Sequence, residues 1–156
     1  MTMRDYTLSD EFGRQTKFRG ERLVRESTEG EVHRPRWQEV EVYRTEAGNW
    51  VVFRATNYRI RHSHDRCSRA DGYALTPARP SDTYPCRECL GSGNAVPGGL
   101  GQLSRISVDS YTSVDDLILS FRAQDGVYSA LSRAILADLS EQDERVDATW
   151  NTVVVP

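Results

Sequence analysis

Two short clusters of side chains could bind a metal ion: His64 and Cys67 form the first, and Cys86 and Cys89 form the second. Two intervening residues separate the donors within each cluster, and residues 68–85 separate the clusters. Zinc prefers thiolate and imidazole ligands in a tetrahedral arrangement, and two donor pairs about 15–20 residues apart are typical of zinc sites. The sequence therefore predicts one zinc ion bound by these four side chains.

The predicted zinc ion has a full set of protein ligands. Four protein ligands leave no position for water, so we expect the ion to stabilise the fold rather than to catalyse a reaction. His62 alternates with His64 along an extended chain, so His62 is the alternative to His64 as the ligand. Three other interpretations stay open: a redox pair of Cys86 and Cys89, a buried Cys67 without metal, and a hydrolytic zinc with only three protein ligands.

The second cysteine pair lies within the segment CRECLGSG, residues 86–93. This segment matches the C-x-x-C-x-G-x-G unit of the zinc region of DnaJ-type chaperones, which carry several copies where this chain has one. Residues 62–89, in which a histidine and a cysteine precede a later P-C-x-x-C, resemble short Ada-like zinc modules and zinc knuckles. The resemblance implies zinc binding and implies no activity.

The residues before the first cluster have strand character. Segments 17–28 and 36–45 are predicted strands, and 49–61 is rich in β-branched and aromatic residues. The turn at 46–49 contains Gly48, which tolerates a positive φ. A further short strand is expected at 103–108. These segments predict a small antiparallel sheet whose last two long strands form a hairpin.

The residues after the second cluster have helical character. Ser113 can cap a helix with Asp115 and Asp116 in its first turn, where carboxylates complement the helix dipole. A second helix is expected over 127–147, where apolar residues recur at helical spacing. This apolar stripe consists of Val127, Leu131, Ala134, Ile135 and Leu139.

A length of 156 residues fits one domain. We expect an α+β fold: a small antiparallel meander, a zinc-clasped loop excursion from one strand end, and a C-terminal helical pair. Residues 1–16 are expected to be a flexible arm before a single zinc-stabilised domain, 17–156. That domain is expected to comprise a β-rich zinc part at 17–90, a Gly-rich linker at 91–101 and a helical part at 102–156.

Charge is distributed unevenly along the chain. Residues 1–108 carry 17 basic and 14 acidic side chains, whereas residues 109–156 carry 3 basic and 9 acidic ones. A general nucleic-acid-binding domain has a basic excess, so the acidic end favours a protein partner with a basic patch. The candidate partner-binding residues are Glu141, Asp143, Glu144 and Asp147.

A second group of residues supports a nucleic-acid alternative. Arginines near the predicted zinc site could contact phosphates, and a tyrosine among them could stack on a base. This group consists of Arg54, Tyr58, Arg59, Arg61, Arg66 and Arg69.

The sequence carries neither a G-x-x-x-x-G-K-[ST] phosphate-binding loop nor a G-x-S-x-G elbow. It also has no apolar run long enough for a signal peptide or a membrane span, which predicts a cytoplasmic protein without membrane contact. We therefore expect a non-enzymatic accessory or regulatory protein that binds another protein, of a kind suited to a phage or mobile element. A nucleic-acid-binding regulator is the first alternative, and a zinc hydrolase or redox protein is the second.

Overall fold

The computed structural model describes residues 2–28, 36–61, 84–85, 100–123 and 126–151. The chain forms two compact units. The first unit comprises Met1–Ser27, Val40–Arg54 and Ile106–Pro156, and the second comprises Thr28–Glu39 and Ala55–Arg105.

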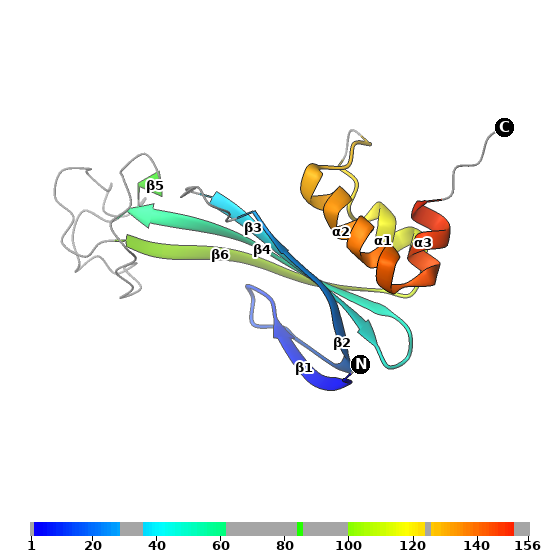
Figure 1. Cartoon of the computed structure of the whole chain (residues 1–156). Helices are drawn as coiled ribbons and strands as arrows, with labels where there is room; N and C mark the ends of the chain where they lie inside the picture. Colours follow the sequence, from blue (N-terminus) through cyan, green and yellow to red (C-terminus); the bar gives the residue numbers. More distant parts are fainter. Residues whose placement is uncertain (1, 29–35, 62–83, 86–99, 124–125, 152–156) are drawn as a thin grey trace. The chain divides into compact units, whose positions relative to one another are not determined.

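The strands form one sheet in which β4 has several neighbours (Figure 1). The order is β1-β2-β3-β4, and both the long strand β6 and the two-residue strand β5 pair with β4. The five long strands form a curled antiparallel sheet, whereas β5 runs parallel to β4. The strands are β1 (Arg4–Ser9), β2 (Gln15–Ser27), β3 (Arg36–Thr45), β4 (Trp50–Arg61), β5 (Tyr84–Pro85) and β6 (Leu100–Tyr111).

The expected hairpin is confirmed. Strands β3 and β4 are joined by a tight turn in which Gly48 has a φ of 85°. The amide of Thr45 donates to the carbonyl of Asn49 at 2.8 Å, and the Thr45 hydroxyl accepts from the Asn49 amide at 3.0 Å. The turn therefore depends on a residue that adopts positive φ without strain, as the sequence suggested.

Strand β1 lies where a flexible arm was expected. Its six residues pair antiparallel with β2, from Arg4 opposite Gly20 to Ser9 opposite Gln15. Tyr6 stacks on its partner Phe18 with ring centroids 5.3 Å apart. The arm expectation was wrong for this segment, because cross-strand aromatic contact of this kind stabilises a hairpin whose sequence is otherwise polar.

Three helices follow β6, where two were expected. They are α1 (Val114–Leu119), α2 (Ala130–Gln142) and α3 (Glu144–Trp150). Ser113 caps α1 as predicted, since its side chain accepts from the amide of Asp116. The expected long helix is interrupted at Asp143, whose extended backbone ends α2 and whose side chain caps α3 by accepting from the amide of Arg145.

The main core of the first unit lies between the helices and one face of the sheet, as Figure 1 shows. The apolar stripe of α2 consists of buried Ile135, Leu136 and Leu139 together with partly buried Leu131, whereas Ala134 and Val127 are exposed. The buried core residues are Leu23, Val24, Val40, Val42, Trp50, Val52, Leu117, Ile118, Phe121, Ile135, Leu136, Leu139 and Val146.

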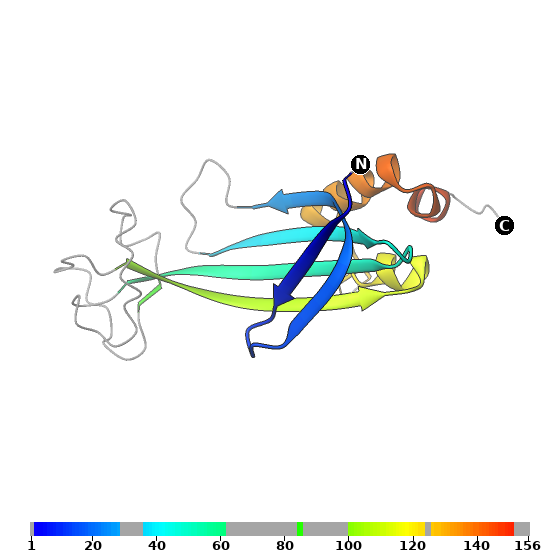
Figure 2. The ribbon, with the colours of Figure 1, turned by 90° about the horizontal axis from the view of Figure 1, so that it is seen from below.

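The opposite face of the sheet carries a smaller apolar cluster. Its buried members are Tyr43, Val51 and Val108, and Tyr6 and Phe18 of the β1–β2 hairpin pack against them. Figure 2 shows β1 crossing the long strands diagonally on this side. The hairpin thus covers part of the face that the helices leave open.

Candidate functional site

The four predicted zinc donors, His64, Cys67, Cys86 and Cys89, lie outside the described residues, as does His62, the alternative to His64. The strands that precede them in the chain are described, however. Strand β5 pairs in parallel with the end of β4, with Ile60 opposite Tyr84 and Arg61 opposite Pro85. Among the residues that the structure describes, no cluster of three or more His, Cys, Asp or Glu side chains could hold a metal ion.

This pairing fixes where the two donor segments begin. Arg61 immediately precedes His62, and Pro85 immediately precedes Cys86. Neighbouring strands lie about 4.8 Å apart, and zinc binds sulfur at about 2.3 Å and imidazole nitrogen at about 2.0 Å. The two donor segments thus leave the sheet from adjacent backbone positions, which fits donors that share one ion.

Arg54, the first member of the arginine group, has a structural role in the first unit. Its Nη2 donates to the Ser120 hydroxyl at 2.8 Å and to the Ser120 carbonyl at 3.2 Å, while its Nη1 lies 3.8 Å from a carboxylate oxygen of Asp109. Its guanidinium carbon lies 4.9 Å from the centroid of the Phe121 ring. These contacts link β4 to the end of α1 and to β6.

The other members of the arginine group are described only in part. Tyr58 is partly buried in β4. Arg59 and Arg61 belong to β4, but their side chains are not among the described features. Arg66 and Arg69 lie outside the described residues. The grouping of these side chains into one phosphate-binding surface stays a prediction.

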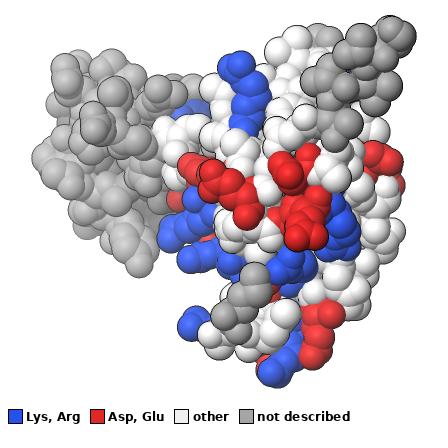
Figure 3. Space-filling model, turned by 45° about the vertical axis from the view of Figure 1, so that its right-hand side comes forward, with Lys and Arg blue, Asp and Glu red and all other residues white. Residues whose placement is uncertain are grey.

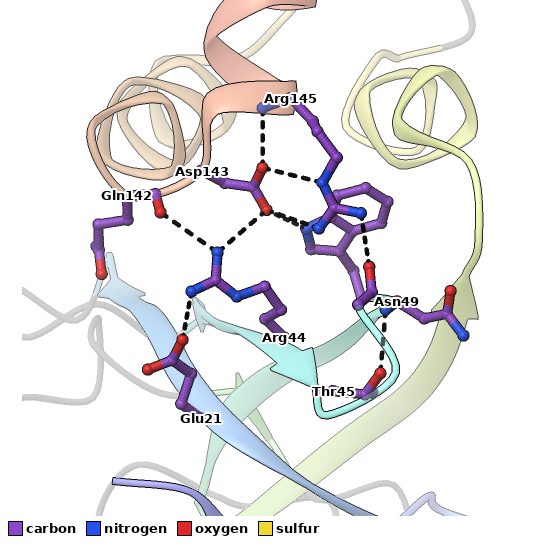
Figure 4. A network of polar contacts seen from close by, with 9 residues as sticks. Glu21, Arg44, Thr45, Asn49, Gln142, Asp143 and Arg145 are labelled. Atoms are coloured by element: carbon purple, nitrogen blue, oxygen red, sulfur yellow. Dashed lines mark hydrogen bonds and ion pairs between the residues drawn. The ribbon is translucent and has the colours of Figure 1, made fainter. Parts of the chain in front are cut away.

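The acidic group predicted on the last helices contains one buried member, Asp143, which is 3% exposed. Figure 4 shows its carboxylate at the centre of a polar network. Its Oδ2 accepts from Trp50 Nε1 at 3.1 Å and from Arg145 Nη2 at 3.1 Å, and lies 3.7 Å from Arg44 Nη1. Arg44 in turn donates to Glu21 through Nη2 at 2.5 Å.

Further contacts hold the same network to the hairpin and to β2. The Arg145 guanidinium lies over the Trp50 ring, 4.1 Å from its centroid, and donates to the Gly48 carbonyl at 2.8 Å. Gln142 Nε2 donates to the Leu23 carbonyl at 2.6 Å. The α2–α3 junction is therefore fixed to strands far from it in sequence.

Asp143 stays ionised at neutral pH because of these partners. Burial by itself raises the pKa of a carboxyl group, but hydrogen bonds from Arg145 and Trp50, together with the Arg145 charge, lower the pKa of Asp143 below its ordinary value. Contact between Asp143 and a partner stays a prediction, although its carboxylate is buried and accepts from donors of its own chain.

The remaining acidic residues of this group, Glu141, Glu144 and Asp147, are exposed. Figure 3 shows one face of the molecule, on which acidic side chains gather at the centre with basic side chains beside and below them. Acidic and basic side chains therefore lie close together on this face. Such a pattern favours a protein partner with complementary charges over a nucleic acid, whose backbone is uniformly negative.

The turn between β1 and β2, residues 10–14, carries a feature that the sequence analysis did not find. Phe12 at its tip is 88% exposed. The Asp10 carboxylate accepts from the amides of Phe12 and Arg14, each at 2.9 Å, and Gly13 has a φ of 81°. The available signal was Asp10 followed by Gly13, a pattern typical of tight turns.

An open pocket lies beside the β3–β4 hairpin and is lined by Phe18, Arg19, Thr45, Glu46 and Ala47. The Thr45 hydroxyl already accepts from the Asn49 amide. This lining contains neither a histidine nor a cysteine.

No helix within the described part of the chain has both the length and the apolar character that a membrane span requires. Comparison of the chain with protein-family models, with curated proteins and with solved structures finds no match.

Proposed function

We propose that this chain is a non-enzymatic protein that is stabilised by one zinc ion and acts by binding another protein. The observation that carries the proposal is the parallel pairing of β5 with the end of β4. It places Arg61 beside Pro85, so the His62–Cys67 and Cys86–Cys89 donor segments start from neighbouring points of the sheet.

A zinc ion at this position would stabilise a segment that has few other means of folding. Residues 62–90 are polar and contain Pro77, Pro80 and Pro85, which interrupt regular elements. Structural zinc contributes about 10–16 kcal/mol to the folding of small zinc-dependent peptides, an upper guide for this larger chain. Three thiolates and one imidazole would complete the coordination of the ion, so its role is structural. Reduced cysteines of this kind fit a cytoplasmic location.

The contact surface follows from the charges that the fold leaves exposed. Asp143 is used within the protein, whereas Glu141, Glu144 and Asp147 face solvent on α2 and α3. A protein partner with a basic patch would pair with this surface.

Metal analysis and unfolding together test the zinc part of the proposal. We expect one zinc per purified chain, and loss of both the metal and several degrees of thermal stability in Cys86→Ser. Ser68→Ala, which changes a hydroxyl within the same segment, is the matched control and should retain zinc. Full stability of Cys86→Ser without metal would contradict the proposal.

The nucleic-acid alternative depends on Arg59, Arg61, Arg66 and Arg69, because Arg54 is paired with Ser120 and Asp109. It requires oligonucleotide affinity that falls steeply with salt and is lost in a double Arg59→Glu, Arg61→Glu variant. The proposal instead expects neither effect in a fluorescence anisotropy titration.

A further inference from the structure

The β1–β2 turn holds an aromatic side chain in solvent at a defined place. Phe12 is 88% exposed, more than Val127 at 60% and Leu119 at 48%, the other exposed large apolar residues in the described part of the chain. An exposed phenylalanine gives up most of the burial that makes aromatic residues stabilising. That burial becomes available if another molecule covers the ring.

The backbone of the turn is fixed before any partner arrives. The Asp10 carboxylate accepts hydrogen bonds from two amides of the turn. In addition, the Asp10 amide donates to the Arg14 carbonyl at 3.0 Å, and the Gly13 amide donates to the Asp10 carbonyl at 3.1 Å. The amide of Glu11 donates to the Ile106 carbonyl of β6 at 3.2 Å, which anchors the tip to the opposite edge of the sheet. A turn fixed in this way loses little conformational entropy on binding.

The neighbouring charge indicates the chemistry of the partner. Arg14 contacts the Asp10 carboxylate through Nε at 3.4 Å, and its side chain is 79% exposed. Phe12 and Arg14 are thus presented together, on either side of Gly13. Aromatic residues and arginine are each enriched at protein interfaces relative to the rest of the surface.

We propose that Phe12 enters an apolar pocket of a protein partner and that Arg14 pairs with a carboxylate on the rim of that pocket. This inference rests on the proposed function, since it names a surface for the same protein–protein binding. A second copy of this chain or a lipid surface would be a different occupant, and the test separates them.

The test uses the full-length, zinc-loaded chain with the photoreactive residue benzoylphenylalanine in place of Phe12, irradiated in extract of the native host. A second chain carries the same label at Glu144, on the exposed acidic surface. Unlabelled wild-type chain and the Phe12→Ser, Arg14→Glu and Val127→Ser variants serve as competitors. Val127→Ser is the matched control, because it removes an exposed apolar side chain elsewhere.

We expect one protein to crosslink at position 12, within a peptide that lines an apolar pocket bordered by Asp or Glu. Wild-type chain and Val127→Ser should compete equally, while Phe12→Ser and Arg14→Glu should compete on the order of tenfold less well. Because Phe12 and Arg14 are exposed, their variants should keep the wild-type melting temperature.

Four results would overturn the inference: equal competition by Phe12→Ser, crosslinking only to a second copy, Phe12-dependent flotation with phosphatidylcholine–phosphatidylglycerol vesicles, or no crosslink from position 12. A partner that crosslinks from Glu144 in any of these cases would leave the proposed function standing. No protein partner from either position would contradict both.

Discussion

The helix-covered face of the sheet buries its large apolar side chains almost completely, whereas the face crossed by the β1–β2 hairpin leaves most of its members partly exposed. Trp50, Leu117 and Leu139 on the helix side are at most 1% exposed. On the hairpin side Tyr6, Phe18 and Phe53 are only partly buried around Tyr43. This difference in burial indicates that the helix side contributes most of the stability of the first unit, whereas the hairpin side leaves more apolar surface exposed to solvent.

Polar groups follow the same division. The helix side contains an ionised carboxylate, Asp143, whose partners come from β3, β4 and α3. On the hairpin side the Tyr43 hydroxyl donates to Glu41 at 2.6 Å, and burial is the main cause that raises the pKa of Tyr43. A buried charge needs every one of its partners, so the helix side should tolerate substitution less well.

The largest change in stability is expected when a leucine on the helix side is replaced by alanine, and a leucine on the hairpin side serves as the comparison. Leu139→Ala should lower the free energy of unfolding by about 2–5 kcal/mol, because it leaves a cavity at a fully buried position. Leu8→Ala, at a partly buried position on the hairpin side, should cost about 1 kcal/mol. Urea unfolding of both variants measures the difference, and equal losses would remove the distinction between the faces.

The second effect concerns the buried carboxylate. Asp143→Ala should cost about 3 kcal/mol, because Arg44 and the Trp50 indole would lose a buried partner and α3 would lose its cap. Glu141→Ala, an exposed acidic residue at the end of α2, is the control and should change stability by about 0.5 kcal/mol or less. A small loss in Asp143→Ala would mean that the network is not a stability element.

The same network predicts a pH dependence. A carboxyl whose pKa is lower in the folded than in the unfolded chain contributes stability above its unfolded pKa, about 3.9, and loses it as pH falls. The wild-type chain should therefore lose more stability than Asp143→Asn when the pH is lowered from 5 to 2. Parallel acid unfolding curves for the two proteins would contradict this assignment.

The third effect concerns Gly20 of β2, which packs closely against the end of β3. A Cβ added at Gly20 would collide with the Arg44 carbonyl oxygen, so Gly20→Ala should cost about 1–3 kcal/mol. Gly13 has open space around it and only its φ of 81° opposes substitution, so Gly13→Ala should cost about 1–2 kcal/mol. Only Gly20→Ala should also alter the near-ultraviolet signal of the neighbouring aromatic cluster.

The smallest effect is expected at Glu26 on β2. A side-chain hydrogen bond with Asp138 on α2, burial and the Asp138 charge raise the pKa of Glu26. A raised folded pKa means that this contribution to stability is present at acid pH and is lost as pH rises above about 4.3. Glu26→Gln should therefore be more stable than wild type at pH 7 by about 0.5 kcal/mol, with a smaller gain at pH 4. A loss of stability in Glu26→Gln at pH 7 would refute repulsion between the Glu26 and Asp138 carboxylates.

Local signals in the sequence predicted some elements well. Ser113 followed by Asp115 and Asp116 predicts the start of α1, since capping depends on residues within one turn. The β3–β4 hairpin follows from its turn residues and flanking β-branched side chains. By contrast, the burial of Asp143 brings its carboxylate to Trp50 of β4, and no local pattern shows that partner.

Long-range pairing also explains what the sequence did not predict. Strand β1 has few apolar residues, and its Tyr6 contacts Phe18, its register partner in β2, and Tyr43 of β3. Spacing alone predicts the zinc donors, but the neighbouring positions of Arg61 and Pro85 follow from a β4–β5 register that the sequence does not reveal. The exposure of Phe12 likewise depends on the folded hairpin.

The proposed zinc site requires that four side chains from the two predicted donor segments complete the coordination of one ion. X-ray absorption at the zinc edge of the purified full-length chain measures this coordination. We expect one zinc per chain with three sulfur ligands at about 2.3 Å and one nitrogen ligand at about 2.0 Å. A coordinated water oxygen, fewer than three sulfur ligands, or a chain without stoichiometric zinc would contradict it.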